Sequence, residues 1–293
     1  LYCFMLKGSI VALITPFKDD SLDEENYIKL IDYHLKNGTN GIVPGGTTGE
    51  SPTLSHIEHK KIIEISVKEC NSKIPVIAGT GSNSTEEAIE LSKFAEKAGS
   101  DALLIVTPYY NKPTQEGLYQ HYKKINDNVG IPIVIYNIPS RSVIDMSIET
   151  MTQLYELKNI IGVKDATGDL KRVELQKKSM GSDFIQLTGN DDNALEFNKL
   201  GGVGAIGVTA NIAAKLSSDF QKACVEDKAK AVELNKILQP VHTTMFIESN
   251  PSPVKYAASL LNMCEATVRL PLVEVQDNTK KKIYEALKVA KIL

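Results

Sequence analysis

The runs Ala102-Leu103-Leu104-Ile105-Val106 and Ile131-Pro132-Ile133-Val134-Ile135 decide the fold of this chain. Both are short, apolar and rich in β-branched residues, as are strands buried on both faces of a parallel sheet. Six similar runs occupy residues 10–14, 42–43, 76–78, 160–163, 184–187 and 204–208. The starts of consecutive runs lie 20 to 34 residues apart, the length of a strand, a helix and two connections.

The segments between these runs have helical periodicity, as in Ala88, Leu91, Ala95 and Ala98. Ser55–Glu58 and Ser84–Glu87 have the pattern of capping boxes at helix starts. A doubly wound open sheet could also hold eight strands, but eight βα repeats favour a (β/α)8 TIM barrel. After residue 208 only amphipathic helical patterns follow, so we expect a catalytic barrel over 1–225 and a C-terminal helical domain over 226–293.

Composition argues against several functional classes. The chain has 33 basic and 36 acidic residues, a formal net charge of −3, so no concentrated basic face for nucleic acid is expected. No apolar run approaches the ~18–20 residues that span a bilayer, and Leu1–Leu6 is too short for a signal peptide. The four cysteines form no Cys-x-x-Cys pair, which is typical of a reducing compartment. We expect a soluble, cytoplasmic protein in which Leu1–Phe4 precede the natural start at Met5.

Barrel enzymes place their chemistry at the carboxyl ends of the strands, so the polar residues after each run are the candidates. Pro44–Ser51 follows the second run, and its glycines and hydroxyls could hold a carboxylate, although alone it resembles an ordinary turn. Tyr109 and Tyr110 follow the fourth run, where phenols could relay protons or simply cover the barrel rim. Tyr136 and Arg141 follow the fifth run, and arginine pairs well with carboxylates.

Lys164 ends the sixth run and is the sharpest chemical signal. A lysine that finishes a buried strand points toward the barrel mouth, where partial desolvation favours the neutral amine that attacks ketones to form a Schiff base. Taken alone, a strand-end lysine more often reaches water. Gly202–Gly207 fits the dinucleotide fingerprint, but it follows a helical segment and supplies a strand itself, so NAD binding is discarded and no cofactor is expected.

Together these motifs resemble the dihydrodipicolinate synthase family. The resemblance rests on Gly46–Ser51, Thr107–Asn111, Tyr136–Arg141 and Gly162–Gly168, and it runs from Gly8 to the C-terminus. It implies a class I Schiff-base lyase on a (β/α)8 barrel with a C-terminal helical domain. Such enzymes condense pyruvate with L-aspartate 4-semialdehyde, the first committed step toward diaminopimelate and lysine.

The resemblance also implies roles for single residues. Lys164 would form the imine with pyruvate, and Tyr136 would transfer protons, with Thr47 linking it to a Tyr110 supplied by the neighbouring subunit. The active unit would therefore be at least a dimer, usually within a homotetramer built as a dimer of dimers. The substrate-binding residues would be Thr48, Arg141 and the backbone near Gly189 and Ile206. No metal is expected, since His56–His59 does not match the zinc-binding His-Glu-x-x-His spacing.

An allosteric site for L-lysine is a further implication. In lysine-inhibited members the effector lies at the dimer interface, near positions that match Ser51, His56, His59, Asn83, Glu87 and Tyr109. Pro52 departs from the alanine of one subgroup. Glu87 could pair with an ammonium group, but a capping box would also explain it.

Two alternatives stay open at this stage. N-acetylneuraminate lyases and keto-deoxy-sugar-acid aldolases share the lysine and the barrel, but Arg141 and the Thr47-Thr48 pair favour the synthase. A silent barrel that only binds a ligand has no physical need for a lysine nucleophile, a hydroxyl relay and a carboxylate clamp together.

Overall fold

The computed structural model describes residues 6–293, so Leu1–Phe4 and the expected start at Met5 lie outside the described residues. Its main sheet has eight parallel strands in the order β4-β1-β10-β9-β8-β7-β6-β5. They are β1 (Gly8–Ala12), β4 (Gly41–Val43), β5 (Ile77–Gly79), β6 (Ala102–Val106), β7 (Ile133–Asn137), β8 (Ile160–Asp165), β9 (Ile185–Thr188) and β10 (Gly204–Gly207). β4 and β5 are the two ends of this order, and a parallel bridge between Ile42 and Val76 connects them. The predicted (β/α)8 barrel is confirmed.

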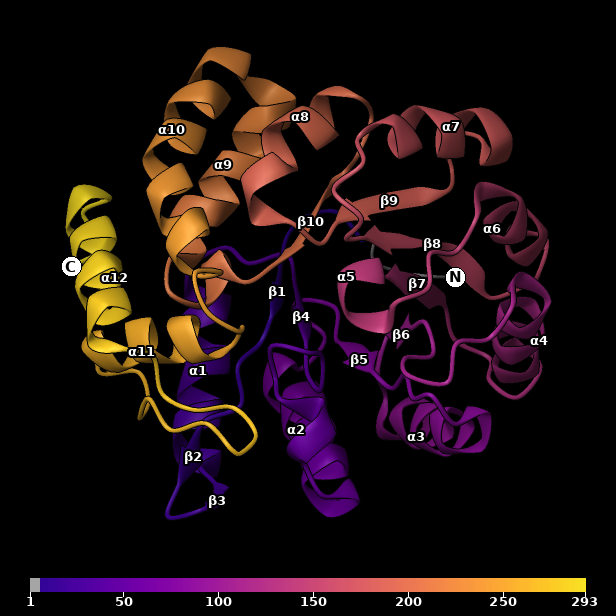
Figure 1. The fold of residues 1–293 in the computed structure, drawn as a ribbon, viewed down its shortest axis with the longest axis horizontal. Coiled ribbons are helices and arrows are strands. Elements are labelled where there is room, and N and C mark those ends of the chain that lie inside the picture. The colour runs from indigo at the N-terminus through magenta and orange to yellow at the C-terminus, as the bar shows by residue number, and fades with distance from the viewer. Residues whose placement is uncertain (1–5) are drawn as a thin grey trace.

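Helices surround this ring of strands, as Figure 1 shows. They are α1 (Glu24–Lys36), α2 (His56–Cys70), α3 (Thr85–Ala98), α4 (Gln115–Asn126), α5 (Pro139–Ser142), α6 (Ile148–Tyr155), α7 (Lys171–Met180), α8 (Ala194–Lys199) and α9 (Ala214–Glu226). Short 3-10 turns follow β4, β9 and β10 at Ser51–Thr53, Asp191–Asn193 and Thr209–Asn211. These turns shape the loops at the carboxyl ends of their strands.

Alternate residues of each strand face opposite layers of the core. On β6, Leu104 belongs to the cluster inside the barrel, whereas Leu103 and Ile105 belong to the cluster under the outer helices. On β7, Val134 and Tyr136 face inward in the same way. Strands buried on both faces are therefore mainly apolar, which explains the nearly continuous runs in the sequence.

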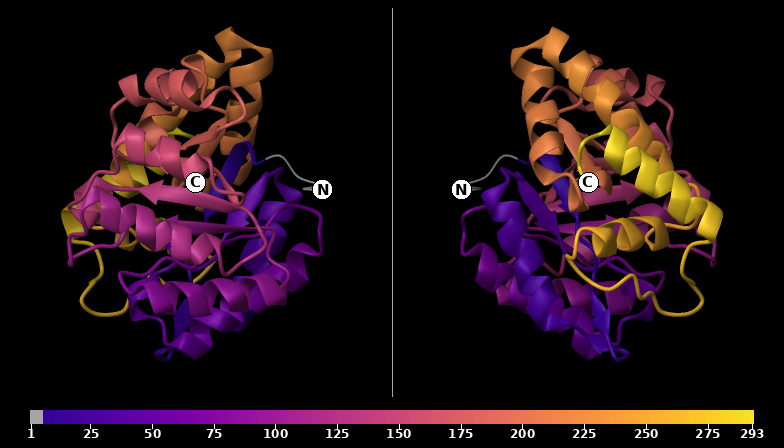
Figure 2. Two further views of the ribbon diagram at one scale, coloured as in Figure 1. Left: turned by 90° about the vertical axis from the view of Figure 1, so that its right-hand side faces the viewer. Right: turned by 90° about the vertical axis from the view of Figure 1, so that its left-hand side faces the viewer.

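Three helices follow the barrel: α10 (Lys228–Thr244), α11 (Ser252–Leu260) and α12 (Asp277–Val289). The side views show them gathered on one side of the barrel (Figure 2). Val241, Val254 and Leu287 of these helices share one core cluster with Tyr27 and Ile62 of α1 and α2. The extension thus packs directly on the barrel, and the boundary near residue 225 remains a proposal.

Two local features differ from expectation. A small antiparallel ladder pairs β2 (Phe17–Lys18) with β3 (Ser21–Leu22), which the sequence patterns had not indicated. The capping box of Ser55 and Glu58 is confirmed, but the second one is wrong in part. Ser84 accepts the amide of Glu87 as predicted, while the Glu87 carboxylate turns away to Ser82 and His56.

Within residues 6–293, no helix is both long and apolar enough to span a membrane.

Candidate active site

Lys164 reaches the interior of the barrel because of its place in β8. Its neighbour Val163 packs under the outer helices, so the alternation of the strand directs Lys164 inward. The side chain is only 5% exposed, and Nζ lies 4.2 Å from the centre of the Tyr136 ring. Tyr136 is the register partner of Lys164 on β7. The amine predicted to be the nucleophile therefore lies beside the aromatic ring of the tyrosine predicted to transfer protons.

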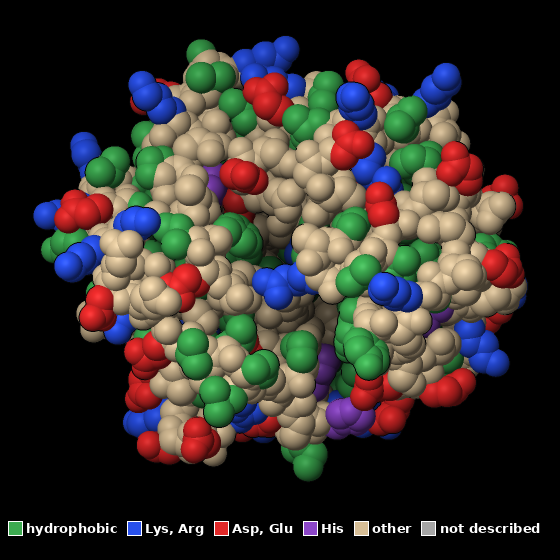
Figure 3. Space-filling view, in the orientation of Figure 1, with side chains coloured by type: hydrophobic (Ala, Val, Ile, Leu, Met, Phe, Trp, Pro, Cys, Tyr) green, Lys and Arg blue, Asp and Glu red, His purple; other side chains and the backbone are tan. Residues whose placement is uncertain are grey.

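A cavity of about 200 Å³ contains this amine. It is lined by Thr47, Thr48, Tyr136, Ile138, Ser140, Arg141, Lys164, Ala166, Gly189, Asn190, Val208, Phe246 and Asn250. Six of the predicted site residues thus meet in one place: Lys164, Tyr136, Thr47, Thr48, Arg141 and Gly189. In the space-filling view, a hollow lies near the middle of the barrel face with a basic side chain beside it (Figure 3).

Gly189 allows the lysine to lie where it does. A Cβ on Gly189 would come within 2.9 Å of Lys164 Cε and 2.8 Å of Ala166 Cβ, closer than such atoms approach one another. The Gly189 amide also donates to the Asp165 carbonyl at 2.7 Å, which fixes this loop against the end of β8. Gly189 thus lies next to the predicted nucleophile.

Two predicted residues do not line the cavity. Ile206 is fully buried in the core cluster inside the barrel. Tyr110 is 87% exposed and holds a left-handed backbone with φ of 72°, which is uncommon for a residue with a side chain. Among residues 6–293, the hydroxyls of Thr47, Tyr110 and Tyr136 make no hydrogen bond to one another. The relay is not assembled within this single chain.

Asn250 is a site residue that the sequence patterns did not indicate. Its Nδ2 donates to Thr48 Oγ1 at 3.0 Å, and its backbone carbonyl accepts from Arg141 Nη2 at 3.3 Å. Asn250 thereby links two predicted substrate-binding residues that are far apart in the chain. The Asn250-Pro251 dipeptide signals a turn. No local pattern shows that this turn folds back over the barrel mouth. Nor does any local pattern place Phe246 in the cavity wall.

A buried ion pair supports the loop that carries Thr47 and Thr48. Glu50 has a left-handed backbone, and its carboxylate pairs with Lys255 of α11 at 2.7 Å. Lys255 also donates to the Thr15 carbonyl at 2.8 Å, and burial lowers the pKa of its ammonium group. The second Glu50 oxygen accepts from the Arg269 amide at 3.0 Å. One carboxylate thus attaches this loop to the C-terminal extension.

A second polar network holds the end of β8. One Asp165 oxygen accepts from the Thr167 amide and hydroxyl at 2.9 and 2.6 Å. The other accepts from Arg172 at 3.1 Å and from Gln176 at 3.0 Å. Arg172 also donates to the Met146 carbonyl at 2.7 Å, in the segment that follows Arg141. The backbone next to Lys164 is therefore fixed by hydrogen bonds to α7.

Part of the predicted lysine site also comes together on the surface. His56 Nε2 lies 2.9 Å from Glu87 Oε1, and Asn83 Nδ2 donates to the Tyr109 carbonyl at 3.2 Å. Hydrogen bonds from Ser82 and then His56 hold the pKa of Glu87 below its usual value. Ser51 begins the 3-10 turn after β4.

His59 is placed differently from the other predicted effector contacts. It is 5% exposed, and its Nε2 lies 2.7 Å from the Gly79 carbonyl. Burial lowers the pKa of this imidazole, so the neutral ring is the form that its surroundings favour. Its observed contact is with the barrel backbone.

Among the described residues, no group of three or more His, Cys, Asp or Glu side chains is placed to hold a metal ion.

Comparison with known proteins gives a consistent result. The profile of the Dihydrodipicolinate synthetase family matches residues 5–290. A 4-hydroxy-tetrahydrodipicolinate synthase of Pelagibacter ubique is 70% identical, covering 99% of this chain and all of that protein. One of Bradyrhizobium diazoefficiens is 56% identical over 96% of this chain and 95% of that one.

Solved structures agree with these relatives. The chloride-inhibited dihydrodipicolinate synthase of Acinetobacter baumannii, in complex with pyruvate, is 45% identical with a TM-score of 0.96, covering 99% of this chain and all of that one. The enzyme of Cyanidioschyzon merolae with lysine bound is 33% identical, also with a TM-score of 0.96, over 99% and 100% of the two chains. With the fold, the buried lysine and these matches in agreement, the chain belongs to the dihydrodipicolinate synthetase family.

Proposed function

We propose that this chain condenses pyruvate with L-aspartate 4-semialdehyde through an imine on Lys164. The product is 4-hydroxy-tetrahydrodipicolinate, in the first committed step of diaminopimelate and lysine biosynthesis. The observation that carries the proposal is the amine of Lys164, buried in a cavity of about 200 Å³ beside the Tyr136 ring. The pyruvate complex of the Acinetobacter baumannii enzyme supports the choice of the keto acid.

The chemistry follows from the groups in the cavity. The neutral amine of Lys164 adds to the ketone carbon of pyruvate, and loss of water gives a protonated imine. This imine is an electron sink, so a methyl proton can leave and the resulting enamine can attack the aldehyde carbon. The amine of the semialdehyde then displaces Lys164 from the imine carbon, which closes the ring and frees the enzyme.

Proton transfers in this sequence fall to Tyr136, whose ring lies next to the amine. Thr47 lines the same cavity, and we assign Tyr110 of a neighbouring copy to the end of the relay. The exposure of Tyr110 supports this assignment, since its side chain is available to a second chain. A site completed by a second chain requires at least a dimer. The proposal includes a cytoplasmic homotetramer, arranged as a dimer of dimers, as the active form.

Substrate carboxylates have partners at two places. Arg141 lines the cavity and can bind the semialdehyde carboxylate with its planar guanidinium. Thr48 and the backbone near Gly189 and Ile206 are assigned to pyruvate. In both cases, donors fixed by the fold would meet an anion inside a partly closed cavity, where a charged hydrogen bond is strongest.

Borohydride trapping tests the central step. Incubation with pyruvate and borohydride should add one reduced pyruvate to the chain, on Lys164, as measured by intact mass and peptide mapping. Lys164→Ala should abolish the adduct, while the exposed control Lys171→Ala should keep it. Absence of the adduct in the unmodified chain would refute the imine. Release of pyruvate from N-acetylneuraminate, without turnover of aspartate semialdehyde, would refute the substrate assignment.

Inhibition by L-lysine is a second part of the proposal. The pairing of His56 with Glu87 and of Asn83 with Tyr109 gathers carboxylate, imidazole and amide groups that suit an amino acid. The lysine-bound structure from Cyanidioschyzon merolae supports it. Glu87→Gln should weaken inhibition by L-lysine and leave uninhibited turnover unchanged, whereas the exposed neighbour Glu86→Gln should alter neither. Inhibition that is equally strong in Glu87→Gln would exclude this site.

A further inference from the structure

A second, smaller cavity lies behind one wall of the substrate cavity. It has a volume of about 10 Å³ and lies between β1 and β10 on one side and α9 and α10 on the other. Asn190 and Val208 line the substrate cavity. Their chain neighbours Asp191 and Gly207 line the small one. The backbone of these two short segments is therefore the partition between the cavities.

Asp191 holds the two segments of this partition together. Its Oδ2 accepts the Val208 amide at 2.7 Å and the Thr209 amide at 3.1 Å, and the side chain is buried. Residue 207 has to be a glycine for this contact, because a Cβ at that position would collide with the Asp191 carboxylate. Hydrogen bonds to a buried charged acceptor are among the stronger ones in proteins. A single carboxylate thus links the turn after β9 to the end of β10.

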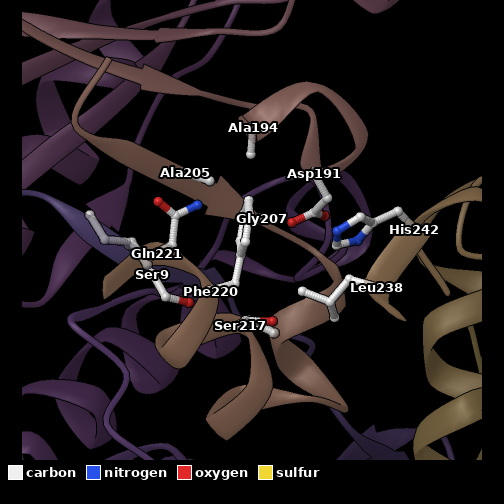
Figure 4. A pocket seen from close by; sticks show the side chains of 12 residues that line it. Ser9, Asp191, Ala194, Ala205, Gly207, Ser217, Phe220, Gln221, Leu238 and His242 are labelled. Atoms are coloured by element: carbon white, nitrogen blue, oxygen red, sulfur yellow. The ribbon is translucent and has the colours of Figure 1, made fainter. Parts of the chain in front are cut away.

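His242 of α10 supports the same segment from the other side. Its Nδ1 lies 2.7 Å from Thr209 Oγ1, and the ring is 3% exposed. Figure 4 shows Asp191 and His242 extending toward each other across the small cavity. Among residues 6–293, His242 Nε2 and Ser217 Oγ are buried without a hydrogen-bond partner. A cavity of about 10 Å³ that these two residues line has room for one water molecule to bridge their polar atoms.

From this arrangement we infer that Asp191, together with the Thr209–His242 contact behind it, is a positioning residue for the pyruvate half of the active site. It fixes the backbone at Val208 and Thr209, and through the chain at Gly189 and Asn190, so that the wall facing Lys164 keeps its shape. Asp191 does not touch the reacting atoms, and its effect passes through this wall. The inference rests on the proposed function, because pyruvate is the ligand whose binding is affected.

The test compares three variants in the full-length protein. Asp191→Ala leaves two buried amides without an acceptor and should raise the KM for pyruvate roughly 10- to 100-fold. The concentration of pyruvate that half-saturates borohydride trapping should rise by the same factor. At saturating pyruvate, kcat should stay within about 3-fold, since Lys164 and Tyr136 are intact. Asp191→Asn keeps an oxygen for both amides and should restore most of the pyruvate affinity.

Asp192→Ala is the matched control, because Asp192 is the adjacent acid and its side chain is exposed. It should leave both pyruvate constants unchanged. A folded Asp191→Ala variant with unaltered KM and unaltered half-saturation would overturn the inference, as would a kcat loss without any change in pyruvate affinity.

Thr209→Val decides the matter if Asp191→Ala does not fold. It removes only the hydroxyl that contacts His242 and should raise the half-saturating pyruvate concentration about 2- to 10-fold. No change in this variant would overturn the inference. Failure of the proposed function gives a distinct result, because the unmodified protein would then form no pyruvate adduct at all.

Discussion

Glu50 and Lys255 form a salt bridge of 2.7 Å in which neither side chain is more than 1% exposed. The two residues are 205 positions apart in the chain. Their contact joins the loop of Thr47 and Thr48 to α11, so the barrel and its extension share a buried pair of charges. Removing one partner of such a pair leaves the other charge buried and uncompensated.

Glu50→Gln should therefore lower the free energy of unfolding by about 3–5 kcal/mol. Lys60 and Glu90 provide a control pair with the same 2.7 Å separation, but their side chains are 30% and 58% exposed. Glu90→Gln should leave the free energy of unfolding close to that of the unmodified chain, since exposed ion pairs contribute little. Urea denaturation followed by circular dichroism measures both values. Equal losses in the two variants would show that the buried pair does not hold the loop.

Acid stability should depend on Glu58. The hydrogen bond from Arg269 lowers the pKa of this carboxyl from 4.5 to about 2. Because the folded pKa is depressed, the stabilisation is complete above pH 4.5 and is lost as the pH falls toward 2. In Glu58→Gln, the urea concentration at the midpoint of unfolding should decrease less steeply as the pH falls from 4.5 toward 2. Glu64→Gln, exposed on the same helix, should keep the slope of the unmodified chain.

Gly189→Ala should impair imine formation. The new methyl group would lie within 2.9 Å of Lys164 Cε, so the lysine side chain has to move away from its position over Tyr136. We expect the rate of borohydride-trapped adduct to fall at least about 10-fold, since small misplacements of reacting groups are costly. Gly181→Ala is the control, because no atom lies within 4 Å of the position that its Cβ would take. Its positive φ makes folding a required check, and the rate of adduct formation should match the unmodified chain.

Tyr110→Phe should lower kcat by about 10²-fold or more, the usual contribution of a proton-transfer group. Mixing tests whether the phenol acts across a subunit boundary. Hybrids of Tyr110→Phe with Lys164→Ala would contain one site with an intact lysine and a Tyr110 from the other chain. Co-expression should therefore regain activity that neither variant has alone. No regain in verified hybrids would place the whole relay within one chain.

Much of the fold could be predicted because its strands are buried on both faces. Runs such as Ala102–Val106 are apolar throughout, and their spacing of one βα unit is visible in the sequence. The ladder of β2 and β3 was missed because each strand has only two residues, too few to show alternation. Glu87 was assigned to a capping box because sequence spacing alone does not show which neighbour its carboxylate binds.

The active site was predictable where chemistry follows directly after a strand. Lys164 and Tyr136 are the next-to-last residues of β8 and β7, so their place in the barrel mouth follows from the topology. Asn250 and Asp191 were missed for a different reason. Their importance comes from contacts with Thr48 and with the Val208 amide, which lie 202 and 17 residues away. Hydrogen bonds made at such separations leave no periodic trace in the sequence.

The position of Asn250 and Phe246 in the cavity wall has a consequence for the synthesis of this polypeptide on the ribosome. Both residues lie beyond the last barrel strand, and so does Lys255, which anchors the loop of Thr47. A ribosome that has already released every strand of the ring has still not produced a complete catalytic pocket. Synthesis must continue through α11 before the nascent polypeptide contains all the parts of its active site.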